Sequence, residues 1–137
     1  MIGFKQAWQQ QWIAAKVNDN PIQWVSINST KPGRNNDVTC IVAHSHNSWA
    51  DTHINDDLLQ TQTFLLEQFQ QVTGIDCTHA DYISTHRWKY AIVNEAEKSE
   101  PYFNSDKNLG SVSDWSSKSR IEECWLNAMQ LAEQIKH

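Results

Sequence analysis

The sequence LGSVSDWSSKSRIEECWLNAMQLAEQI, which runs from Leu109 to Ile135, combines the features of a strand, a turn and a long helix. Apolar Leu109 and Val112 predict a short strand, and the hydroxyl-rich turn after it contains Asp114. A helix is expected from about Ser119 to Ile135. Its apolar face consists of residues at helical spacing: Ile121, Trp125, Ala128, Ala132 and Ile135. A carboxylate is therefore expected where a strand ends and a helix begins, next to N–H groups that suit phosphate or other polar groups.

A second amphipathic helix is expected upstream, from Asp56 to Thr73. Asn55 or Asp56 can cap its N-terminus, and Gly74 ends it in the usual way. Its apolar stripe consists of residues near helical spacing: Leu58, Leu59, Leu65, Leu66, Phe69 and Val72. The pattern is typical of a helix with one buried face.

Strands are expected on both sides of this upstream helix. The segments with strand character are Trp12–Val17, Ile22–Asn28, Val38–His46, Cys77–Val93 (bent around Thr85–Arg87), Tyr102–Phe103 and Leu109–Val112. Turn-forming residues separate them at 18–21 and 31–37. Val38–His46 is apolar on both faces, which favours a central position in a sheet. Because strands and helices do not alternate, the sequence predicts an α+β fold, with a mostly antiparallel sheet packed by two main helices on one face.

Length and composition limit the class of protein. The 137 residues suit a single domain, 1–137, and the net charge of −5 argues against a nucleic-acid partner. There is no apolar run of roughly 18 residues that would span a membrane. The N-terminus lacks the apolar core of a signal peptide, and three widely spaced cysteines, Cys40, Cys77 and Cys124, are typical of reduced thiols. These features favour a cytoplasmic location.

Cofactor and metal motifs are sparse. The four glycines form no G-x-G-x-x-G, so a dinucleotide-binding turn is absent from this sequence. His44 and His46 would point the same way on a strand, and His53 or His79 could join them as metal ligands. Partner cysteines or carboxylates at recognisable spacing are lacking, so no metal site is predicted. No nucleophile and base stand out in a familiar order, so the catalytic residues stay unknown.

Four segments together resemble the C-terminal half of the renalase-like family of FAD-dependent oxidoreductases, which is related to the amine oxidases. In the family's order they are Trp12–Val17 with Pro21–Trp24, Asn28–Arg34, His86–Ala91, and Ser113–Trp115 with Arg120–Glu122 and Trp125–Leu126. The resemblance covers nearly the whole chain. It departs from the family at Ser113, where the family has glycine.

The resemblance implies a specific role for this chain. Members of the family bind FAD with an N-terminal Rossmann-type half, and a second region, a sheet backed by helices, covers the flavin ring and shapes the substrate pocket. This chain is similar to that second region, with 109–137 as the closing strand and helix that return to the FAD-binding half. The reaction implied is hydride transfer from an amine or a reduced nicotinamide-like substrate to flavin. Lacking the Rossmann half, the isolated chain is expected to hold no FAD and to be inactive.

The resemblance also suggests site residues, each with a simpler alternative. Asp114, Trp115, Arg120 and Glu122 would contact the cofactor; alternatively, Asp114 caps a turn, and Arg120 and Glu122 lie on a solvated helix face. The substrate pocket would use five residues: His86, Trp88, Tyr90, Lys31 and Arg34. On a strand His86, Trp88 and Tyr90 would share one face, which could equally pack under a helix. Lys31 and Arg34 could meet an anion or simply belong to a charged hairpin loop.

Two hypotheses follow. In the first, the chain is a fragment or subunit of a flavin oxidoreductase, with an exposed apolar face that pairs with an FAD-binding half or with a second copy. In the second, it is a non-catalytic α+β binding module. That module would use a face lined by some of its seven tryptophans for a ligand or a protein partner.

Overall fold

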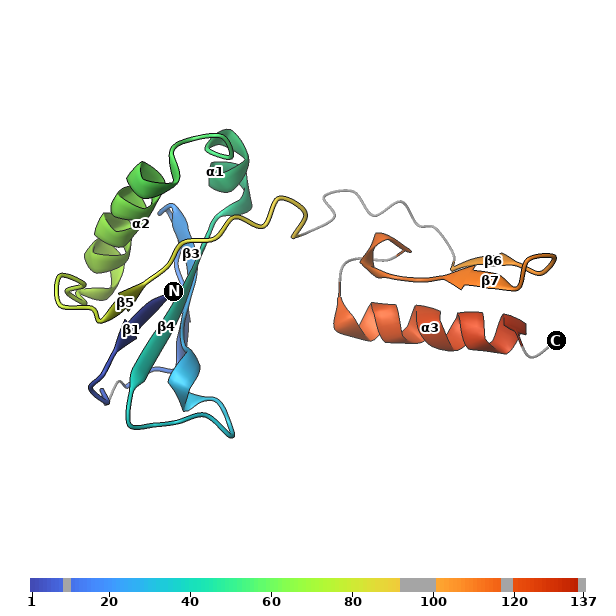
Figure 1. The fold of residues 1–137 in the computed structure, drawn as a ribbon, viewed down its shortest axis with the longest axis horizontal. Coiled ribbons are helices and arrows are strands. Elements are labelled where there is room, and N and C mark those ends of the chain that lie inside the picture. Colours follow the sequence, from blue (N-terminus) through green and yellow to red (C-terminus); the bar gives the residue numbers. More distant parts are fainter. Residues whose placement is uncertain (9–10, 92–100, 117–119, 136–137) are drawn as a thin grey trace. The chain divides into compact units, whose positions relative to one another are not determined.

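A computed structural model describes residues 1–8, 11–91, 101–116 and 120–135 (Figure 1). They belong to two compact units, Met1–Arg87 and Trp88–His137. The first unit contains a five-stranded antiparallel sheet, and the second contains a two-stranded sheet. The predicted α+β class with mostly antiparallel pairing is confirmed. The expectation that residues 1–137 form a single domain stays a prediction.

The larger sheet has the strand order β2-β3-β4-β1-β5. Its strands are β1 (Ile2–Phe4), β2 (Ala14–Lys16), β3 (Ile22–Ile27), β4 (Thr39–Ser45) and β5 (Tyr82–Ile83). The apolar character of β4 on both faces predicted a central strand, and β4 does lie in the middle of the sheet, between β3 and β1. A register shift between Ile22 and Trp24 interrupts the β3–β4 ladder.

One face of this sheet forms the hydrophobic core. Neighbouring strands bring buried side chains into register, for example Ile2 opposite Ile41 and Ile27 opposite Ile41. The core consists of Ile2, Phe4, Ile22, Val25, Ile41, Phe69, Ile75 and Cys77. Phe69 comes from helix α2 (Leu58–Thr73), which therefore covers this face of the sheet.

Helix α2 begins two residues later than the pattern predicted. Asp57, rather than Asn55 or Asp56, is the N-cap, because its carboxylate accepts hydrogen bonds from the N–H groups of Leu59 and Gln60, both at 2.9 Å. Gly74 ends the helix in the left-handed conformation (φ +71°), as predicted. Leu58 and Leu59 precede the part of α2 that reaches the core and remain exposed.

The connections combine predicted turns with one missed helix. In the predicted turn at 18–21, the Asn20 carboxamide oxygen accepts a hydrogen bond from the N–H of Ile22 (2.8 Å). A short 3-10 helix, η1 (Asn28–Thr30), leads into the predicted loop at 31–37. Helix α1 (Asn47–Thr52) was not predicted, because a six-residue segment is too short to show helical periodicity.

The prediction of a long β segment over Cys77–Val93 is wrong for the described residues. Only Tyr82–Ile83 forms a strand there, and residues 92–93 lie outside the described ranges. Asp76 accepts hydrogen bonds from the N–H and the hydroxyl of Thr78, which form a local turn in place of a ladder. β5 pairs with the short strand β1, and their ladder ends at hydrogen bonds between Met1 and Ser84.

The second unit is a hairpin with one helix. Strands β6 (Tyr102–Asn104) and β7 (Leu109–Ser111) pair antiparallel, and the 3-10 helix η2 (Asp114–Ser116) precedes α3 (Ile121–Ile135). A Cβ on Gly110 would lie 3.1 Å from a methyl group of Leu131, so α3 packs closely on β7. The Asn127 amide donates hydrogen bonds to the carbonyl and hydroxyl oxygens of Ser116 (3.1 and 3.0 Å).

The side of α3 that meets the hairpin is therefore not its most apolar side. Leu131 is buried, whereas Ile121, Trp125 and Ile135, three residues of the expected apolar face, are 92%, 61% and 58% exposed. No helix among the described residues is long and apolar enough to cross a membrane.

Candidate functional site: the open face of the five-stranded sheet

The face of the sheet opposite α2 carries aromatic and polar side chains. The register places Tyr82 beside Gly3 and Gly3 beside Cys40, in one row across β5, β1 and β4. A second row, across β4, β3 and β2, contains His44, Trp24 and Lys16. Between them lie Val42, Ser26 and Ala14. We call these nine residues the open face.

The open face is accessible within the first unit. Trp24 is 40% exposed and Tyr82 is 56% exposed, and Cys40, His44 and Lys16 are exposed as well. A Cβ on Gly3 would lie only 3.3 Å from the Cβ of Tyr82, so glycine allows the tyrosine to lie close to β1. Aromatic rings with N–H and O–H groups at their edges suit a flat ring that also offers hydrogen-bond partners.

The composition of this face could not be predicted from the alternation of side chains alone. The alternation of side chains shows which residues of β3 share a side, but only the pairing of strands brings Tyr82, Cys40 and Trp24 to one surface. Cys40 is exposed on this face. Cys77 is buried instead, and burial raises the pKa of its thiol.

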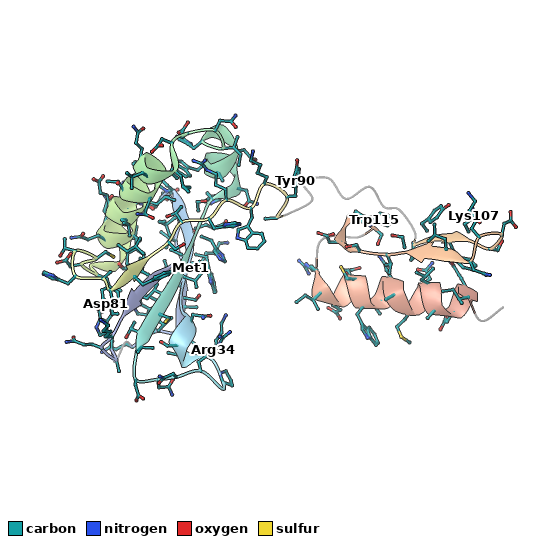
Figure 2. All side chains as sticks on the ribbon, viewed as in Figure 1. Met1, Arg34, Asp81, Tyr90, Lys107 and Trp115 are labelled. Carbon is teal, nitrogen blue, oxygen red and sulfur yellow. The ribbon has the colours of Figure 1, made fainter. Side chains whose placement is uncertain are left out.

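The predicted substrate-pocket residues His86, Trp88 and Tyr90 do not share a strand face. They follow the end of β5 in irregular chain, in the segment where Figure 2 labels Tyr90. Trp88 and Tyr90 are 76% and 96% exposed. Alternation predicted a shared strand face for these residues. That prediction is wrong because no described strand pairs with the chain beyond Ile83. Arg87, between His86 and Trp88, donates hydrogen bonds to the Asp56 carbonyl oxygen and to the Thr61 hydroxyl (3.1 Å).

Lys31 and Arg34 lie at the other end of the sheet from this Arg87 contact. Their loop joins η1 to the start of β4, and both side chains are exposed (Figure 2). The Arg87 contact lies near the start of α2, beyond the end of β4. The first unit therefore places the charged loop and the Arg87 contact at different ends of its sheet.

The four predicted cofactor residues all belong to the second unit. Asp114 and Trp115 are in η2, where the Ser113 hydroxyl donates a hydrogen bond to the Asp114 carboxylate (2.9 Å). Arg120 and Glu122 are exposed at the start of α3, where the Arg120 carbonyl accepts from the N–H of Cys124 (3.0 Å). Glu122 suits the positive end of the helix dipole without any ligand.

These four residues do not by themselves fit a flavin. Trp115 is 39% exposed, Arg120 and Glu122 are exposed, and Ser113 places a side chain beside Asp114 where a closely approaching cofactor needs a bare backbone.

The histidines considered as metal ligands are separated by the fold. His46 is the N-cap of α1, and the His53 ring stacks on Trp49 at 4.1 Å between centroids. Among the described residues, no group of three or more possible ligands gathers to hold a metal ion. A search against protein-family models finds no match to this chain.

Proposed function

We propose that this chain is the substrate-covering part of an FAD-dependent oxidoreductase that resembles the renalase-like family. The observation that carries the proposal is the open face: an antiparallel sheet backed by α2 on one side, with Trp24, Tyr82 and His44 accessible on the other. Such a surface is suited to lie over a flat ring and its substrate. The flavin itself would be held mainly by an FAD-binding half.

The exposed apolar side of α3 supports the need for that half. Its large apolar side chains are 48 to 92% exposed: Ile121, Trp125, Leu126, Met129 and Ile135. Several large exposed apolar side chains on one helix are typical of an interface. We propose that this side of α3 packs against the FAD-binding half, and association between two copies through the same surface is the competing outcome.

The reaction would be hydride transfer. FAD, held by the other half, would supply the hydride acceptor for an amine or a reduced nicotinamide-like substrate. An amine would give up a proton as well as the hydride to become an imine, whereas a reduced nicotinamide would give up the hydride alone. Trp24 and Tyr82 would orient the substrate ring and exclude water, and the His44 imidazole could exchange a proton with the substrate. Asp114, which belongs to the second unit, is proposed to accept a hydrogen bond from a cofactor hydroxyl.

The experiment uses the protein purified from its natural source with a tag on this chain. We expect the assembly to show a flavin absorption band that bleaches when an amine or a reduced nicotinamide is added without oxygen. An assembly without flavin would contradict the proposal and favour a binding module that uses the open face without redox chemistry.

A pair of variants connects the activity to the open face. Trp24→Leu should slow flavin reduction at least about ten-fold, because substrate orientation is worth more than 1.4 kcal/mol in a closed site. Leu59→Ala is the matched control, because Leu59 is 69% exposed on α2, on the other side of the sheet. Equal rates of flavin reduction in the two variants would show that the open face is not part of the active site.

A further inference from the structure

A pocket of about 230 Å³ lies between α1 and the first turns of α2. It is lined by Trp49, His53, Asp56, Gln60, Thr61 and Phe64. No strand contributes to it, so it is distinct from the open face and does not depend on the proposed function. Pockets for drug-sized ligands occupy roughly 300–1,000 Å³, so this one suits a small group.

Three nearly parallel rings shape this pocket. Trp49 stacks on His53 with an interplanar angle of 12°, and on Phe64 with an angle of 8° and 5.5 Å between centroids. Phe64 is 38% exposed although it takes part in this stack. The aromatic lining of the pocket is therefore open to solvent at Phe64.

The polar groups left for a ligand accept hydrogen bonds. His53 Nδ1 lies 2.7 Å from the Trp49 carbonyl oxygen, which can only accept, so Nδ1 carries the proton and Nε2 is an acceptor in the neutral ring. The interactions that the structure shows for Asp56 use its backbone N–H and C=O, which leaves its exposed carboxylate available. A ligand that donates hydrogen bonds or carries positive charge matches both groups.

Two other groups at the pocket are already occupied. The Thr61 hydroxyl donates to the Asp57 carbonyl oxygen (2.7 Å) and accepts from Arg87 (3.1 Å). The same Arg87 nitrogen donates to the Asp56 carbonyl oxygen, so Arg87 braces the α1–α2 loop. Residues 47–61 contain three carboxylates, Asp51, Asp56 and Asp57, and no lysine or arginine. Their negative charge therefore exceeds the single positive charge of the Arg87 guanidinium.

We propose that this pocket binds an organic ammonium head group. Trp49 and Phe64 supply aromatic surface that attracts a cation, and Asp56 supplies the opposite charge at the rim. A trimethylammonium group, which is compact and weakly hydrated, suits a small pocket of this kind better than a flat ring does.

The test compares two ligands of the same shape. Choline and its uncharged carbon isostere, 3,3-dimethylbutan-1-ol, are titrated into the full chain, and binding is followed by NMR at the Trp49 indole N–H. We expect choline to bind about three-fold or more tighter than the isostere. Equal affinities, or no saturable binding of choline, would overturn the proposal.

Two variants and a control assign the effect to these residues. Asp56→Asn removes the charge and keeps the shape, and Phe64→Leu removes an aromatic ring that is partly exposed. Each should weaken choline binding about three-fold. Asp51→Asn, on α1 with Trp49 but outside the pocket lining, should bind as the unchanged chain does. Unchanged affinity in Asp56→Asn would exclude a cation site at this rim.

Discussion

The two units of this chain differ in how much apolar surface they bury. In the first unit, Ile22, Val25, Ile41 and Phe69 are 0 to 2% exposed, and α2 seals one face of a five-stranded sheet. In the described part of the second unit, Leu131 is the buried large apolar residue, whereas most of its apolar side chains are exposed. A two-stranded sheet with one helix offers little surface to bury.

This difference separates a unit that has its own hydrophobic core from a unit whose described residues bury little apolar surface. Burial of apolar surface is the dominant favourable term in folding, and among the described residues the contiguous cluster of buried apolar side chains lies in the first unit. In the second unit, α3 is held on the hairpin by packing of Leu131 against Gly110 and by hydrogen bonds such as that from Asn127 to Ser116. We therefore expect its stability to depend on what covers α3.

The largest effect is expected from Phe69→Ala in the core of the first unit. Phe69 is 1% exposed, and its loss should lower the free energy of unfolding of this unit by about 3–5 kcal/mol. Hydrogen exchange of the sheet amides, measured by mass spectrometry, follows this unit alone. Leu59→Ala, on an exposed turn of the same helix, is the control and should change little. If the sheet amides of Phe69→Ala are protected as well as those of Leu59→Ala, Phe69 does not contribute the expected stability to this unit.

A smaller and strictly local effect is expected from Leu131→Ala. Leu131 is 8% exposed against Gly110, so its truncation should cost about 2 kcal/mol and release α3 from the hairpin. Exchange of the α3 amides should quicken while the sheet of the first unit stays protected. Met129→Ala, at an exposed position of α3, is the comparison. Loss of protection in both units together would show that they fold as one.

Removal of the α2 cap should have an intermediate effect on the first unit. Asp57→Ala leaves the N–H groups of Leu59 and Gln60 without their carboxylate acceptor and should cost about 1 kcal/mol. Urea unfolding followed by far-ultraviolet circular dichroism measures it. Asp56→Ala, which does not cap the helix, should change the free energy of unfolding less. A larger effect of Asp56→Ala than of Asp57→Ala would show that Asp56 is the N-cap.

The smallest expected effect is a pH dependence at the edge of the sheet. The Lys5 N–H donates to the Asp81 carboxylate (2.8 Å), and the Lys5 ammonium lies 3.1 Å away, so the pKa of Asp81 is lowered. A lowered pKa in the folded state adds stability above the unfolded pKa, and this stability is lost as pH falls through the folded pKa.

Asp81→Asn should therefore unfold slightly more easily at neutral pH and lose less stability on acidification. Urea midpoints at pH 7 and at about pH 3 measure the difference. Asp37→Asn, in the exposed 31–37 loop, is the control. An acid response equal to that of the unchanged chain would show that the Lys5 contact is not maintained in solution.

Local signals predicted much of the fold. β3, β4, the turns and most of α2 were recognisable from alternation, helical spacing and Gly74, because these depend on neighbouring residues. The strand expected over Cys77–Val93 failed because a strand needs a partner, and the described ladder of β5 ends at Ser84. The site was less predictable than the fold. Whether His86 and Lys31 lie close together depends on the strand order, which the sequence does not give.

The sequence by itself determined the class of fold, the central position of β4 and the amphipathic character of the two long helices, because periodicity and composition are local properties. Only the tertiary structure decided that Tyr82, Cys40 and Trp24 share one face, that Trp49 stacks with Phe64, and that α3 turns Leu131 rather than Trp125 toward its hairpin. These features arise from strand pairing and from contacts between distant residues, which no short window of sequence contains.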